Sequence, residues 1–86
     1  MYRYADLKDE LFTDEGQKTF LKIRDAVHKI LVIAGAVRMQ EVMSAAGVGD
    51  SWVTQACVDR LVELGEIREI TQTDVMGQHR VFVSTR

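Results

Sequence analysis

One cysteine and two histidines are the residues of this sequence best suited to nucleophilic catalysis or zinc binding: Cys57, His28 and His79. The cysteine has no second cysteine to pair with, and its neighbours Ala56 and Val58 provide no basic setting that would activate a thiol. We therefore expect Cys57 to be a small buried apolar residue. The two histidines lie far apart and have no cysteine or histidine at ligand spacing, so we expect no metal site.

Other catalytic patterns are also missing from the sequence. It has no nucleophile elbow, no glycine loop that would hold a phosphate, and no carboxylate pair that could be placed in one pocket. The 86 residues fit one small domain with little room for a substrate cavity. We expect neither an enzyme nor a cofactor. No stretch reaches the roughly 18 apolar residues that cross a bilayer, and a lone cysteine fits a reducing cytoplasm, so we expect a cytoplasmic protein without membrane contact.

The net charge of −2 is unevenly distributed along the chain. Residues 1–16 have a balance of −3, whereas residues 17–86 have a balance of +1. We therefore divide the sequence into an acidic leader, 1–13, and a main domain, 14–86. Phosphate binding depends on clustered lysines and arginines, and the main domain shows no strong cluster. This is the main argument of the sequence against simple DNA binding.

The first helix is predicted over residues 14–34. Asp14 is the expected N-cap, with Gln17 at the spacing of a capping box, and Gly35 is the expected C-terminal cap. The leader could add one or two helical turns that dock on the main domain through Tyr4, Leu7, Leu11 and Phe12. Apolar residues of the first helix recur every three or four positions and should face the core: Phe20, Ile23, Val27, Ile30, Leu31 and Ala34.

Two shorter helices and two strands are predicted next. Val37 could enter a brief extended segment, and the following helix ends at Gly47. A third helix, 50–64, is capped by Asp50 or Ser51. Segments 66–72 and 79–85 are rich in β-branched and aromatic residues and predict two strands around a loop at 73–78. In the third helix, Thr54, Cys57, Val58 and Leu61 should face inward, and Trp52, Gln55, Asp59 and Glu63 should lie on other faces.

The segment "MQEVMSAAGVGDSWVTQACVDRLVELGEIREI", followed by "HRVFVST", resembles the winged helix-turn-helix superfamily. It shares the small residues that end one helix, the glycine turn, the capped next helix and the "RLVELGEI" that leads into a wing. The resemblance covers residues 14–84. It implies an α+β fold, with a three-helix core followed by a C-terminal β-hairpin wing.

In that family the third helix enters the major groove and its exposed N-terminal part touches base edges. The resemblance therefore implies a sequence-specific binder of double-stranded DNA, a dimeric transcriptional regulator that inserts helix 50–64. Gln55 could pair with adenine and Arg60 with guanine or phosphate, while His79 and Arg80 could brace the wing. The DNA-contacting residues expected on this basis are Ser51, Trp52, Gln55, Arg60, His79 and Arg80.

The same scaffold also serves as a protein-interaction module, and this alternative stays open. Asp59 and Glu63 of the third helix would oppose a polyanion. Trp52, Val75 and Met76 would then contact a protein partner, although Trp52 could equally pack against the second helix or the leader. Residues 30–33 are all apolar and cannot all face one core, so Ile30, Leu31, Ile33 or the leader could form a homodimer contact.

Overall fold

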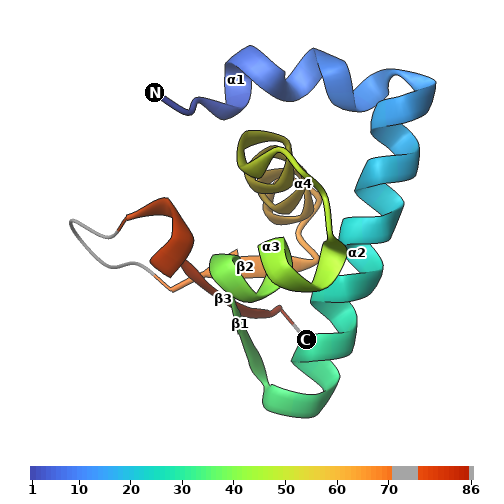
Figure 1. Ribbon diagram of the computed structural model, residues 1–86. Coiled ribbons are helices and arrows are strands. Elements are labelled where there is room, and N and C mark those ends of the chain that lie inside the picture. The colour runs from blue at the N-terminus through green and yellow to red at the C-terminus, as the bar shows by residue number, and fades with distance from the viewer. Residues whose placement is uncertain (71–75, 86) are drawn as a thin grey trace.

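The computed structural model describes residues 1–70 and 76–85, and its fold is α+β (Figure 1). Helices are packed against one face of a small antiparallel sheet. In chain order the elements are α1 (Tyr4–Leu7), the 3₁₀ helix η1 (Lys8–Phe12), α2 (Asp14–Ala34), β1 (Ala36–Arg38), α3 (Met39–Ala46), α4 (Ser51–Glu63), β2 (Ile67–Glu69), the 3₁₀ helix η2 (Gly77–His79) and β3 (Val81–Ser84).

The long helix α2 has the predicted bounds, but its N-cap is not the predicted residue. The hydroxyl of Thr13, rather than the carboxylate of Asp14, accepts a hydrogen bond from the N–H of Gly16 at 3.0 Å. A threonine in extended conformation directly before the helix presents its oxygen to the free N–H groups of the first turn. At the other end Gly35 has φ of 78°, the left-handed conformation that glycine adopts without strain.

Helices α3 and α4 confirm the predicted order of helix, glycine turn and capped helix. Gly47 follows α3 in the left-handed conformation, with φ of 63°. The carboxylate of Asp50 caps α4 by accepting hydrogen bonds from the N–H groups of Trp52 and Val53. Because the cap and the turn fix where α4 starts, they also determine which of its residues face the core.

The sheet has three strands in the order β1-β3-β2, all antiparallel. Val37 pairs with Phe82 in the register of β1 and β3, and Glu69 pairs with Phe82 in that of β2 and β3. The sequence predicted a brief extended segment at Val37 but not its pairing with the last strand. β3 is thus a central strand, and the side chain of Phe82 on it is fully buried.

The core forms where α2, α3, α4 and the sheet meet. Cys57, Thr54, Val58 and Leu61 are buried, as predicted for the inward side of α4. On α2 the prediction is wrong for Ala34, which is exposed because the helix extends beyond the core at its last turn. The side chains that α2, β1 and α3 contribute with least exposure are Ile23, Val27, Val37, Met39 and Val42.

The leader lies against the main domain, as predicted. In Figure 1 it runs from the start of α2 across α4, on the side of α4 that is turned away from the sheet. Leu11 is only 3% exposed and belongs to the core, whereas Phe12 is half exposed. The chain crosses itself tightly here, because a Cβ on Gly16 would lie 2.0 Å from the carbonyl oxygen of Glu10. Glycine at position 16 is what permits this approach.

Candidate functional site

The outward face of α4 is the surface that a winged-helix DNA reader would use. It is the side opposite Val58 and Leu61, and helical spacing puts Trp52, Ala56, Asp59 and Glu63 on it. Ala56 should therefore be exposed, yet it is fully buried. The leader packs against this side of α4. The face that sequence reasoning assigned to solvent is therefore partly an internal contact, with Ala56 buried and Trp52 exposed.

Three side chains of the leader donate hydrogen bonds to α4. The hydroxyl of Tyr2 donates a hydrogen bond to Asp59. The hydroxyl of Tyr4 donates to Oε1 of Glu63 at 3.1 Å, and Nζ of Lys8 donates to Oε2 of the same carboxylate at 2.8 Å. The two acids that made α4 look unsuited to DNA thus bind this chain's own leader.

These contacts shift the ionisation of the groups involved. Hydrogen bonds from Lys8 and Arg60 lower the pKa of Glu63 to about 2. Burial, together with the hydrogen bond to Glu63, raises the pKa of Tyr4 to about 12, and burial beside Asp59 raises the pKa of Tyr2 as well. At neutral pH both tyrosines are therefore protonated hydrogen-bond donors, and Glu63 is a charged acceptor.

Arg80, predicted to brace the wing on DNA, is bound between two carboxylates. Its Nη2 lies 2.7 Å from Oδ1 of Asp59 and 2.8 Å from Oε1 of Glu69. The guanidinium also lies over the ring of Phe82, 5.1 Å from its centroid. The hydrogen bonds to Glu69 and Asp59 raise the pKa of Arg80 despite its burial. Arg80 joins β2 and β3 to α4, and its donors are directed inward.

Arg60 is engaged in a similar way. It forms an ion pair with Glu63 on the next turn of α4, and its guanidinium lies 5.2 Å from the centroid of the Phe12 ring. A phosphate or a guanine would have to replace these contacts. The two arginines expected to contact DNA are both bound to carboxylates of their own chain.

Gln55, expected to read adenine, is not exposed. The prediction that it lies on a solvent face is wrong, because the side chain is only 8% accessible. The 3₁₀ helix η2 folds back on α4 here, so that a Cβ on Gly77 would lie 2.8 Å from Oε1 of Gln55. The sequence placed Gly77 and Gln78 in a loop and His79 in a strand, and η2 was not predicted.

The remaining expected contact residues are accessible. Ser51 is exposed in the first turn of α4, and Trp52 beside it is 45% exposed. His79 is exposed as well, but it belongs to η2 and not to a strand as predicted. Met76, one residue before η2, is 64% exposed. Val75, the other apolar residue expected at the tip of the wing, lies outside the described residues.

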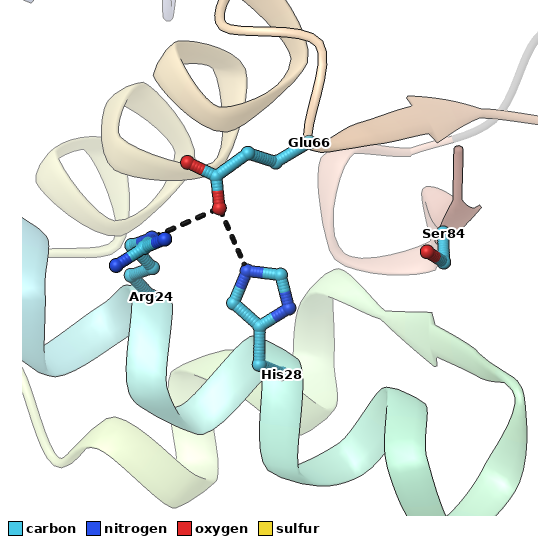
Figure 2. A pocket seen from close by; sticks show the side chains of 4 residues that line it. All are labelled: Arg24, His28, Glu66 and Ser84. Atoms are coloured by element: carbon cyan, nitrogen blue, oxygen red, sulfur yellow. Dashed lines mark hydrogen bonds and ion pairs between the residues drawn. The ribbon is translucent and has the colours of Figure 1, made fainter. Parts of the chain in front are cut away.

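A second polar group lies between α2 and the sheet (Figure 2). Oε1 of Glu66 accepts hydrogen bonds from Nε of Arg24 at 2.9 Å and binds Nε2 of His28 at 2.8 Å. Burial alone raises the pKa of Glu66, but the two hydrogen bonds outweigh it, and the net shift is downward. With Ser84 these residues line an open hollow of about 370 Å³. The three paired side chains tie the start of β2 to α2.

Little in the described residues supports covalent or metal chemistry. Cys57 is fully buried, as predicted, and burial raises the pKa of its thiol to about 12. Such a thiol is protonated at neutral pH and is a poor nucleophile. Across residues 1–70 and 76–85, no cluster of three histidine, cysteine or acidic side chains could hold a metal ion.

Comparisons with family models, with curated proteins and with solved structures find no match to this chain. Among the described residues, no helix combines the length and the apolar character that crossing a membrane requires. The function must therefore be argued from the geometry of the chain itself.

Sequence reasoning missed the contact between the leader and α4. Tyr2 and Tyr4 carry it, and both lie more than 50 residues before the acids that they bind. The sequence did contain one indication of this contact, the apolar and aromatic residues of an otherwise acidic leader. They predicted that the leader docks on the main domain but not that it docks on α4. Glu66 was likewise read only as the start of a strand, although it connects Arg24 and His28.

Proposed function

We propose that this chain is a winged helix-turn-helix domain that serves protein–protein contact, and that α4 does not read DNA. The winged-helix assignment is supported by the order α2, β1, α3, α4, β2, β3 and by the three-stranded antiparallel sheet. The glycine turn at Gly47 and the cap at Asp50, which separate α3 from α4, agree with it.

The observation that carries the functional part is that leader side chains bind both acids on the outward face of α4. A helix that enters the major groove must present that face to base edges. Here Ala56 is fully buried, and Asp59 and Glu63 are bound to leader side chains. DNA binding through this face would require removal of the leader and exposure of Leu11, a core residue.

Electrostatics supports the same function. Affinity for DNA comes largely from cations that neutralise phosphates. Arg60 and Arg80 already neutralise Glu63, Asp59 and Glu69. Their charge is therefore not available to a polyanion without the loss of three or more ion pairs.

The proposed contact surface is the exposed start of α4 together with the residue before η2. Trp52 and Met76 are large apolar side chains with 45% and 64% exposure. Gln55 packs against Gly77, so that the segments carrying Trp52 and Met76 meet beside this contact. Tryptophan is enriched among the residues that dominate binding energy at interfaces. The partner should offer an apolar pocket that receives the indole.

The test is to compare Trp52→Ala with the neighbouring Ser51→Ala in capture from a cell extract. Because the indole is half exposed, its removal should leave the melting temperature close to that of the wild type. We expect one protein to be retained by the wild type and by Ser51→Ala but lost with Trp52→Ala, and to bind again as a purified partner. Equal retention by all three forms would contradict the proposed surface.

DNA binding is the second candidate function, favoured by one observation. Ser51 and Trp52 are exposed in the first turn of α4, the part of a recognition helix that touches bases. His79 of η2 is exposed as well. Under this alternative only the first turn of the helix, and none of the buried or paired residues, would meet the duplex.

A further inference from the structure

The solvent side of α2 carries apolar side chains that the fold does not use. Leu21 is 56% exposed, Val32 is 86% exposed and Ile33 is 87% exposed. Helical spacing puts Leu21 and Val32 on the side of α2 opposite Ile23 and Val27, which are fully buried, and puts Ile33 at the edge of that side. We call this side the outer face of α2. Of the apolar residues 30–33 that suggested a homodimer, Leu31 is buried and is thereby excluded, whereas Ile30 is only half buried.

The outer face of α2 also carries charges of both signs. Lys18, Lys22, Asp25 and Lys29 are all exposed on it. In the described part of the chain none of these four forms an ion pair. This differs from α4, where each acid is bound to a cation or a tyrosine. The charges of α2 are therefore available to a partner.

A shallow hollow lies on the same face. It has a volume of about 470 Å³ and is lined by Asp25, His28, Lys29, Val32 and Ile33. Apolar side chains and one unpaired charge of each sign thus surround a depression that can receive a side chain. Leu21, two turns before Lys29, is an apolar side chain on the same face that could enter such a hollow in a second molecule.

We propose that the occupant of this face is a second copy of the chain, with its α2 antiparallel to the first. If the two-fold axis passes near residue 27, Asp25 lies opposite the partner's Lys29 and Leu21 lies opposite the partner's Val32. Symmetry repeats each contact, which gives two ion pairs and two apolar pairs.

A parallel arrangement does not satisfy the same residues. In register, it would put each lysine of α2 beside its own copy and Asp25 beside the partner's Asp25. Like charges in direct contact cost free energy and reject a binding mode. Charge complementarity therefore selects the antiparallel pair.

The contact is small, and this sets the expected affinity. The stretch from Leu21 to Ile33 spans about 18 Å at the rise of an α-helix. One helix face of that length buries less than the roughly 800 Å² per partner of a standard stable interface. We therefore expect a reversible dimer that forms with increasing protein concentration and not an obligate one.

This proposal is tested by sedimentation velocity over a wide range of protein concentration. The variants reverse one charge of the pair at a time and then exchange both. In the Lys29→Glu variant an acid faces the partner's Asp25 at both symmetric sites. In the Asp25→Lys variant a cation faces the partner's Lys29 at both sites. Each should raise the dissociation constant about tenfold or more. The double variant Asp25→Lys with Lys29→Glu restores opposite charges across the axis and should restore the dimer.

Arg68→Glu is the matched control, because Arg68 is an exposed cation of β2 on another part of the molecule. It should sediment as the wild type does, and Val32→Asp should sediment as a monomer. The proposal is overturned if the wild type is a monomer at every concentration, or if Lys29→Glu dimerises as the wild type does. A double variant that remains monomeric contradicts the antiparallel register. Trp52→Ala should still dimerise, so this result is independent of the proposed function.

Discussion

At the scale of single residues, the most informative side chain is Glu63. A glutamate near the end of a solvent-facing helix turn is ordinarily a solubilising group. Here it accepts from Tyr4 and forms ion pairs with Lys8 and Arg60. One carboxylate thus joins the leader to α4, and its ionisation should influence how firmly the leader is held.

The contribution of Glu63 to stability should depend on pH. Its pKa is lowered from 4.5 to about 2, so the stabilisation is present above pH 4.5 and is lost as pH falls toward 2. We expect Glu63→Gln to unfold at lower urea concentration than the wild type at pH 7. The difference between the two midpoints should shrink steadily as pH falls below 4.5. A difference that is the same at pH 7 and at pH 3 would contradict the role of the charged carboxylate.

The burial or capping role of a single residue could be predicted from the sequence where local helix geometry determines it. The burial of Cys57 and the cap at Asp50 follow from helical spacing and from side-chain chemistry. The prediction failed for Gln55, because that residue lies at the border of the inward face and a segment more than 20 positions later covers it. No local pattern contains that information.

At the scale of elements, the leader determines what α4 can do. It is anchored by Leu11 in the core, and the crossing at Gly16 brings η1 against the start of α2. The tyrosines then reach the acids of α4. The leader is therefore a structural layer of the domain and not a mobile acidic tail.

The substitution Gly16→Ala tests how tightly the leader is built into the fold. In an ordinary helix this change stabilises by up to about 1 kcal/mol. Here the new methyl group would overlap the carbonyl of Glu10, so we expect a loss of about 1–3 kcal/mol in the free energy of unfolding, as in other overpacked sites.

Urea denaturation measures the effect of Gly16→Ala, with Gly49→Ala as the control. A Cβ at Gly49 meets no atom within 4 Å, so the control should change stability little. An alanine at position 16 that stabilises the protein would mean that the leader does not cross α2 so closely.

The sequence predicted most elements because each has a signal of its own: the periodicity of α2, the glycines after α2 and α3, and the cap of α4. It did not predict the pairing of β1 with β3, since a three-residue strand has too few residues to show a period. It also did not predict η2, which is held by contacts with α3 and α4.

At the scale of the whole molecule, the two ends of the chain enclose α4 from two sides. The leader covers its outward face, and Arg80, after η2, binds Asp59 beside it. Among the exposed apolar residues, Trp52 and Met76 lie at the start of α4 and before η2, and three others lie on the outer face of α2. This distribution of covered and open surface is the basis for proposing a protein-interaction module.

The most direct test of that account is a fluorescence-anisotropy titration of a labelled random DNA duplex with the wild-type protein at low ionic strength. Because Arg60 and Arg80 are bound to carboxylates and the outward face of α4 is covered, we expect no saturable binding. Saturable binding that weakens steeply as salt is added, with the slope that release of counterions from DNA produces, would contradict the central claim.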